Sequence, residues 1–357
     1  MTTIPIPGML DPHVHLRGMQ WAHKGTFASE TEAALAGGYW AVLDMPNTPP
    51  STIDRPALER KLAEIAAQAL CDWGLYYGAA KADNWGTYPA IIDDVCGLKI
   101  YNNATTGNLL IDDQAIRAQH YQHWPRSKVI AVHAEDETMR DILALVRQYR
   151  QRTHFCHICT TYEIGLLRAA KAEGLPVTLG VTPHHLFLTE DDIKRLGTHG
   201  LMKPPLKTRA DQAALWQALA DGLVDVVESD HAPHTLAEKS SEKTYYGVPG
   251  LQTTLPLLLT AVHEKRLPLE RAVALVSANP RRIFGLECPP DTYTLVDLGE
   301  SFVIDSAWLR GGCGWSPFEG MRVRGRVRSV SIRGTQVFDG ESVRVRPGFG
   351  QNLFGKR

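Results

Sequence analysis

The chain has 357 residues, of which 44% are hydrophobic and 22% charged, and its formal net charge is -1. This composition is typical of a globular protein that dissolves in water, and it gives little support for a membrane or nucleic-acid partner. The amino end lacks the features of a secretory signal, and the 6 cysteines lack the density of a disulfide scaffold, so we expect a cytoplasmic protein with reduced thiols.

Strand-like runs alternate with helical segments between residues 8 and 234. Apolar residues recur at helical spacing in the intervening segments 54–69, 136–150 and 160–173. The segment 81–94 is the weakest helix, because it is short and contains Pro89. Eight strands, each followed by a helix, close a (β/α)8 TIM barrel of the α/β class. The eight runs are GMLDPHVHL, YWAVLDMP, CDWGLYYGAA, CGLKIYN, KVIAVHAE, THFCHIC, LPVTLGVTPHH and LVDVVESDHAPH.

The pattern changes after Leu286. The stretches TYTLVDLGESFVIDS and MRVRGRVRSVSIRGTQVFDGE alternate apolar and polar residues, as half-buried antiparallel strands do. We therefore predict a barrel over residues 8–286 and a small β-rich appendage formed by residues 1–7 and 287–357, packed on the barrel.

Polar side chains close several of the predicted strands. His13 and His15 are separated by one residue, so they point to the same side of the first strand. The carboxyl ends of barrel strands form the active face, and imidazole and carboxylate groups gathered there bind borderline divalent metals such as zinc. The other candidate groups are Lys99 in the fourth run, His133 in the fifth, His157 in the sixth and Asp230 in the eighth.

Lys99 differs from these groups because an ammonium cannot bind a cation. Within an apolar strand a lysine loses its proton more easily, and the neutral amine reacts with carbon dioxide. The resulting carbamate carries a negative charge and two oxygens, so it can bridge two metal ions as a carboxylate does. This carbamylation of Lys99 is a hypothesis from the sequence.

Structural roles are the alternative for any single histidine. A lone histidine near a strand end is more often a hydrogen-bonded structural residue than a ligand, but the joint pattern over five strands favours a metal site. Cys156 is interpreted as a buried residue that faces away from the site, and His184 and His185 are as consistent with packing as with catalysis. Structural roles are expected for the histidines at 23, 120, 123, 154, 199 and 263.

Several motifs together resemble a known enzyme family. The chain is similar to dihydroorotases of the amidohydrolase superfamily, and most of all to the short form found in the animal multifunctional pyrimidine-pathway protein. The similarity runs from about residue 8 to residue 286. The motifs are DPHVHLRG, AALAGG, MPNT, GLKIY, AVHAED, CHIC, TPHHLFL, SDHAPHT, VPGLQTTLPLLLTAV and NPRRIFGL.

The resemblance implies a role for each candidate residue. It implies two zinc ions bridged by carbamylated Lys99, the first also bound by His13, His15 and Asp230 and the second by His133 and His157. It implies that Arg17 and Asn47 bind the substrate carboxylate, with Lys203 offering further charge, and that Thr105, beside Thr106, reaches over the substrate. It also implies that His234 and the backbone around Pro249 and Gly250 contact the substrate.

The reaction implied by the resemblance is reversible hydrolysis of dihydroorotate to N-carbamoyl-aspartate, a step of pyrimidine biosynthesis. Metal ions lower the pKa of water, and Asp230 would act first as general base and then as general acid. Homo-oligomerisation and association with aspartate carbamoyltransferase are further expectations, which the residues themselves do not decide.

The chain departs from the family at three positions. Animal relatives carry a glutamate at the position of Gly180, which is associated with a third metal together with Cys156, so we predict two metals here. Lys203 stands where an asparagine or arginine is common and cannot bind a carboxylate through two parallel bonds. Glu228 stands where small or apolar residues are usual, and the sequence offers no account of it.

Two other functions fit part of the pattern. An allantoinase or hydantoinase would share the metal site but bind a different ring, and Arg17 with Asn47 favours a ring that carries a carboxylate. A homologue without activity that serves as a scaffold would also share the fold, although the complete ligand set argues against this alternative.

Overall fold

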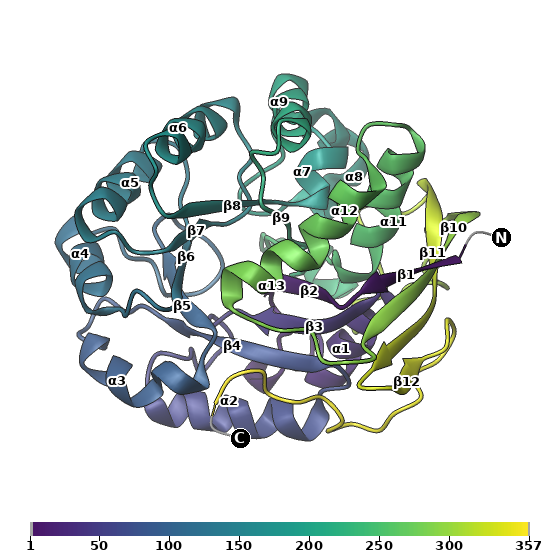
Figure 1. Ribbon diagram of the computed structural model, residues 1–357, viewed down its shortest axis with the longest axis horizontal. Helices are drawn as coiled ribbons and strands as arrows, with labels where there is room; N and C mark the ends of the chain where they lie inside the picture. The colour runs from purple at the N-terminus through teal and green to yellow at the C-terminus, as the bar shows by residue number, and fades with distance from the viewer. Residues whose placement is uncertain (1–2, 356–357) are drawn as a thin grey trace.

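The computed structural model describes residues 3–355 (Figure 1). Its centre is a sheet of eight parallel strands that follow one another in chain order. The prediction of a (β/α)8 barrel is confirmed, and each of the eight predicted runs contains one strand. The strands are β2 (Met9–Val14), β3 (Tyr39–Asp44), β4 (Asp72–Gly78), β5 (Gly97–Tyr101), β6 (Val129–His133), β7 (Thr153–Phe155), β8 (Val177–Val181) and β9 (Val226–Val227).

Helices surround the strands on the outside of the barrel (Figure 1). The three predicted helical segments correspond to α2, α5 and α6. Of the described residues, none lies in a helix long and apolar enough to cross a membrane. The helices are α1 (Phe27–Ala36), α2 (Arg55–Gln68), α3 (Tyr88–Ile91), α4 (Gln114–His123), α5 (Thr138–Tyr149), α6 (Thr161–Ala172), α7 (Pro183–Phe187), α8 (Ile193–Leu196), α9 (Arg209–Ala220), α10 (Leu236–Lys239), α11 (Leu251–His263), α12 (Leu269–Val276) and α13 (Ala278–Phe284).

Local sequence explains where these helices begin. The side chain of Thr160 accepts a hydrogen bond from the backbone N–H of Glu163, and the Glu163 side chain accepts from the N–H of Thr160, which forms a capping box at the start of α6. At the start of α2 the side chain of Asp54 accepts a hydrogen bond from the backbone N–H of Ala57. Between β4 and β5 the chain forms only the short α3 and two 3₁₀ turns, in the segment where Pro89 weakened the expected helix.

A second sheet lies beside the barrel. Its order is β1-β10-β11-β12, formed by β1 (Thr3–Pro7), β10 (Tyr293–Val303), β11 (Arg322–Ile332) and β12 (Thr335–Phe338), and all its pairs are antiparallel. The amino-terminal strand thus pairs with a strand from the last quarter of the chain (Figure 1). The expected half-buried antiparallel strands are present in this sheet.

The barrel closes where the first and last strands meet. Val14 forms a parallel bridge with His231, and the backbone N–H of His15 donates to the carbonyl of His231 at 2.7 Å. Below this bridge the buried Asp11 carboxylate accepts from the backbone N–H of Ser229 at 3.1 Å. This closure brings the carboxyl end of β2 beside that of β9, so side chains from the two ends of the barrel sequence meet.

Candidate active site and metal centre

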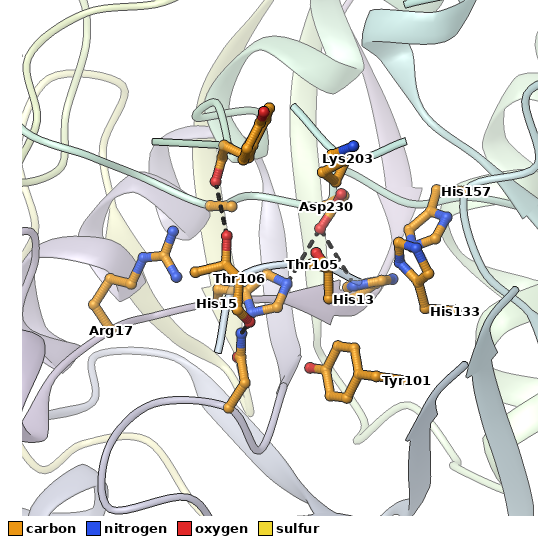
Figure 2. A pocket seen from close by; sticks show the side chains of 14 residues that line it. His13, His15, Arg17, Tyr101, Thr105, Thr106, His133, His157, Lys203 and Asp230 are labelled. Atoms are coloured by element: carbon orange, nitrogen blue, oxygen red, sulfur yellow. Dashed lines mark hydrogen bonds and ion pairs between the residues drawn. The ribbon is translucent and has the colours of Figure 1, made fainter. Parts of the chain in front are cut away.

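A cavity at the carboxyl ends of the barrel strands collects most of the predicted site residues (Figure 2). This is the end of a TIM barrel at which active sites lie. Lys99, His234, Pro249 and Gly250 are not part of its lining. The predicted residues that do line it are His13, His15, Arg17, Asn47, Thr105, His133, His157, Lys203 and Asp230.

The two histidines of the first strand meet Asp230. Nε2 of His13 and Nε2 of His15 each lie 3.3 Å from Oδ1 of Asp230 (Figure 2). The Nδ1 atom of His15 lies 2.8 Å from Oδ1 of Asn47, a contact that orients the ring. The side chains of His13, His15 and Asp230 are buried, and one ligand atom from each lies within 4.8 Å of the others. A single cation can therefore contact all three.

His133 and His157 form a second pair beside the first. Their ring centroids are 4.6 Å apart, and the His157 ring centroid lies 5.3 Å from that of His13. Nε2 of His133 faces Glu135 Oε1 at 2.8 Å, which leaves its Nδ1 free to bind a ligand. The buried Nδ1 of His157 has no hydrogen-bond partner among the described residues. Both rings can thus offer a nitrogen to a cation.

Lys99 is completely buried in β5 behind these rings. Its Nζ atom lies 3.3 Å from Sγ of Cys156 and 5.1 Å from the centroid of the Tyr101 ring. Burial lowers the pKa of His133 and of His157, and the nearby charge of Lys99 adds to this effect. Lys99 therefore lies among the histidines, although its free amine is not part of the cavity lining.

The orientation of Cys156 differs from the prediction. Its side chain is buried, as expected, but it does not face away from the site, because its Sγ accepts from Lys99 and lies near His13. The strand β7 ends at Phe155, and His157 has a φ of 40° in the left-handed region. Side chains no longer alternate beyond the strand end, so positions 156 and 157 both face the centre of the barrel.

Charge and burial set the protonation of the donor groups. Burial lowers the pKa of His15 to about 4, so this ring is neutral at pH 7. Burial raises the pKa of Asp230, but the neighbouring His13 and His15 rings outweigh it and hold that pKa well below its usual range. Burial and Lys99 lower the pKa of His13, whereas Asp230 and Cys156 raise it, with a net rise to about 10.

These donors fit a divalent cation such as zinc. Neutral imidazoles and an ionised carboxylate are the forms in which these groups bind zinc. Burial lowers the pKa of His13, but Asp230 and Cys156 raise it above its usual value, so a metal ion would compete with a proton for this ring. The affinity for the metal would therefore depend on pH.

Glu228 explains two of the departures noted in the sequence. Its buried carboxylate accepts from the backbone N–H of His157 at 2.7 Å, and it lies 3.1 Å from Nε2 of His154. A Cβ atom at Gly180 would lie 2.5 Å from Cδ and Oε1 of Glu228. The carboxylate from β9 thus occupies the space beside β8 that a side chain at position 180 would need. The two departures therefore belong together.

The substitution Gly180→Ala tests this steric coupling. We expect it to lower the free energy of unfolding by about 1–3 kcal/mol, because the added methyl group overlaps a carboxylate that its hydrogen bonds hold in place. The measurement is urea denaturation of the variant and the wild type. Gly165→Ala in α6 is the control, because nothing lies within 4 Å of a Cβ there. A Gly180→Ala protein as stable as the wild type would contradict the prediction.

Arg17 places a guanidinium without a carboxylate partner among the described residues at the other side of the cavity. Its Nε donates to the carbonyl of Pro233 at 2.9 Å, and its Nη2 lies 3.3 Å from Nε2 of His234. Within residues 3–355 no carboxylate forms an ion pair with it. Burial lowers the pKa of Arg17 to about 10, so it keeps its charge at neutral pH. The cavity thus holds a positive group ready for an anionic ligand.

The loop after β5 covers the cavity. Thr105 and Thr106 both line it, and Oγ1 of Thr106 donates to the carbonyl of Tyr246 at 3.2 Å. Nδ2 of Asn47 donates to the carbonyl of Thr106 at 3.0 Å, so Asn47 links this loop to His15. The ring of Tyr246 faces Lys203, whose Nζ lies 5.0 Å from the ring centroid.

Three predicted contacts lie behind the lining. His234 is fully buried beside Arg17, while Pro249 and Gly250 lie against His231, to which the N–H of Gly250 donates at 3.1 Å. Their contacts with substrate stay predictions.

Four lining residues were missed by the sequence reasoning. Tyr101 follows Lys99 by two positions in the same strand, so the alternation of side chains was a signal that could have revealed it. Ala232, Tyr246 and Gly247 lie in irregular segments without such a signal. The missed residues are Tyr101, Ala232, Tyr246 and Gly247.

Comparison with known proteins identifies the family. A scan against protein-family models finds no match. The chain is 43% identical over 353 residues to the multifunctional protein CAD of Squalus acanthias, covering 98% of this chain but only 16% of that protein. It is 36% identical to the dihydroorotase of Halobacterium salinarum, covering 95% of this chain and 87% of the relative. The chain belongs to the dihydroorotase family. The resemblance predicted from the motifs is confirmed, and these proteins are cyclic amidohydrolases.

Solved structures share the fold of this dihydroorotase-family chain. An L-hydantoinase from Arthrobacter aurescens superposes with a TM-score of 0.93 and 26% identity, covering 99% of this chain and 89% of the other. An inactive dihydroorotase-like domain of a Chaetomium thermophilum CAD-like multifunctional protein has a TM-score of 0.84 and 26% identity, covering 99% of this chain and 100% of the other. The fold therefore occurs in proteins of different activity, and function must be argued from the site.

Proposed function

We propose that this chain catalyses the reversible hydrolysis of dihydroorotate to N-carbamoyl-L-aspartate. The observation that carries the proposal is the position of the Arg17 guanidinium, which has no carboxylate partner within residues 3–355, in the same cavity as the histidines and Asp230. A cyclic amide that bears a carboxylate can place the carboxylate at Arg17 and its amide bond at the histidine cluster. The dihydroorotases among the relatives support this choice of ring.

The chain's own residues would orient the substrate. The Arg17 guanidinium can bind a carboxylate through two parallel hydrogen bonds, and the amide of Asn47 stands on the next strand end. Lys203 adds positive charge without such a planar fork. Thr105 and Thr106 line the cavity and would reach over the bound ring to exclude water from it.

The histidine cluster would hold two zinc ions. We propose that His13, His15 and Asp230 bind one ion, that His133 and His157 bind the other, and that a carbamate on Lys99 reaches both. When bound, such ions lower the pKa of water and polarise a carbonyl group. Cys156 lies beside Lys99, but the proposal needs no third metal.

Asp230 would move the proton in both directions. Its carboxyl is ionised at neutral pH, because the adjacent imidazoles hold its pKa well below the usual range. It can therefore accept a proton from the attacking water and return it to the ring nitrogen that leaves. In the biosynthetic direction the same group would accept the proton from the carbamoyl nitrogen as the ring closes.

Association with other enzymes of the pathway is also proposed. The chain spans 16% of the length of the multifunctional CAD protein and of the multifunctional protein pyr1-3 of Dictyostelium discoideum, to which it is 40% identical. Both relatives are named as multifunctional proteins, which supports an association with further enzymes. We propose a homo-oligomer that associates with aspartate carbamoyltransferase.

A substrate panel tests the proposed function. We expect the zinc-loaded protein to turn over dihydroorotate at least roughly 100-fold more efficiently than hydantoin or allantoin, because only dihydroorotate offers a carboxylate to Arg17. The measurement is kcat/KM for the three rings under identical conditions. A preference for hydantoin or allantoin would assign another cyclic amidohydrolase activity, and zinc-loaded protein that hydrolyses none of them would indicate a scaffold.

A further inference from the structure

Glu30 is a buried carboxylate on the first turn of α1, outside the cavity lining. Its Oε2 lies 2.7 Å from Nε2 of His231, and no lysine or arginine among the described residues forms an ion pair with it. Its Oε1 accepts from the backbone N–H of Gly312 and from Oγ of Ser29, each at 2.7 Å. Burying a carboxylate costs free energy, and these hydrogen bonds offset that cost. They also hold the Glu30 side chain in one orientation.

His231 directly follows Asp230 and is anchored through both ring nitrogens. Because Nε2 faces the Glu30 carboxylate, it carries the proton, and Nδ1 then accepts from the N–H of Gly250 at 3.1 Å. The backbone N–H of His231 donates to Oγ of Ser229 at 3.1 Å, while its carbonyl accepts from His15. Glu30 therefore fixes the tautomer that lets the ring bind on both sides.

Asp230 needs such an anchor because of its backbone. Its φ is 45°, in the left-handed region that favours glycine, and an aspartate there persists only when its surroundings hold it. The carboxylate must nevertheless place one oxygen 3.3 Å from two imidazoles. The fixed position of His231, one residue later, restricts the turn on which Asp230 stands.

The same carboxylate connects the site to the β appendage. Gly312 lies in the loop between β10 and β11, and its N–H donates to Glu30. This contact needs a close approach, because a Cβ at Gly312 would lie 2.9 Å from the Cα of Gly25. The loop of the appendage is thus joined to the catalytic strand end by one carboxylate and one imidazole.

We propose that Glu30 and His231 are a positioning pair that holds Asp230 in the orientation needed to bind metal and move the proton. Neither residue lines the cavity, so neither touches the substrate. The inference rests on the proposed function, since it assigns Asp230 its role there. It deepens that function by adding a group whose removal weakens the site without removing any ligand.

The test compares Glu30→Ala with two other variants. Glu30→Gln keeps an oxygen that can accept from His231, although its amide N–H₂ then faces the N–H of Gly312. We therefore expect Glu30→Gln to lose less zinc affinity and less kcat than Glu30→Ala. Glu32→Ala, on the same helix, is the matched control, because that carboxylate is part-exposed and its ion-pair contact is with Arg310 at 3.9 Å. The readouts are zinc affinity by chelator competition, kcat per bound zinc, KM and the thermal midpoint.

We expect Glu30→Ala to bind zinc about tenfold more weakly and to lose about tenfold in kcat per bound zinc, with KM within about twofold of the wild type. Glu32→Ala should match the wild type in each respect. The proposal would be overturned if Glu30→Ala lowered only the thermal midpoint and kept zinc affinity and kcat per bound zinc within about twofold of the wild type. If Glu30→Ala fails to fold, unchanged zinc affinity in Glu30→Gln overturns it. The chelator assay needs no turnover, so failure of the proposed function can be distinguished from failure of this inference. Wild-type protein that binds zinc but does not hydrolyse dihydroorotate would refute the proposed function.

Discussion

The variant Asp230→Asn is expected to lose turnover by a factor on the order of 10² to 10⁴ while it still binds zinc. Asparagine has nearly the same shape as aspartate and keeps one oxygen near His13 and His15, whereas its amide cannot accept a proton. The wild-type carboxyl is ionised throughout the neutral range, because the two imidazoles hold its pKa far below its usual value. The loss should therefore fall on kcat and not on KM.

The measurement is dihydroorotate hydrolysis together with zinc per chain in the same preparation. Asp221→Asn is a suitable control, since this aspartate pairs with Arg168 on the surface, 2.7 Å away. We expect the control to behave as the wild type. An Asp230→Asn protein with full zinc and near-normal turnover would show that another group carries the proton.

The variant Lys99→Ala is expected to lose most of its bound metal and nearly all of its turnover. Lys99 is completely buried and its amine lies beside Cys156, so its removal takes away the group that we propose to bridge the two ions. Removal of the side chain leaves space behind the rings. A small carboxylate such as acetate can enter that space and replace the carbamate.

Three observations check this expectation. The intact wild-type protein should carry the added mass of one carbon dioxide on Lys99, detected by mass spectrometry under mild conditions. Zinc and activity should fall in Lys99→Ala and recover in part with acetate. Lys99→Met, which fills the space with an apolar chain, should not recover. Full metal content and rate in Lys99→Ala would refute the carbamate hypothesis.

Much of the barrel could be predicted from local patterns. Strand runs such as YWAVLDMP are bounded by turn residues, and α2, α5 and α6 follow apolar residues at helical spacing. Of these helices, α2 and α6 also begin at capping residues. The clustering of His13, His15 and Asp230 follows from the topology, because the carboxyl ends of parallel strands meet at one face.

Other parts of the site depend on contacts that no local pattern contains. Glu30 and His231 lie 201 positions apart, and their pairing depends on how α1 packs beside the end of β9. The relation between Gly180 and Glu228 is likewise steric and appears only when the two strands are adjacent. The left-handed φ of His157, which is uncommon for a residue that is not glycine, lets its side chain face the same side as that of Cys156.

The central claim is that six side chains from distant parts of the chain hold two zinc ions at one end of the barrel. The most direct test is anomalous diffraction at the zinc absorption edge from crystals of the purified, zinc-loaded protein. We predict two peaks in the cavity, one beside His13, His15 and Asp230 and the other between His133 and His157, with density from Lys99 reaching both. The absence of any peak among these side chains would contradict the account.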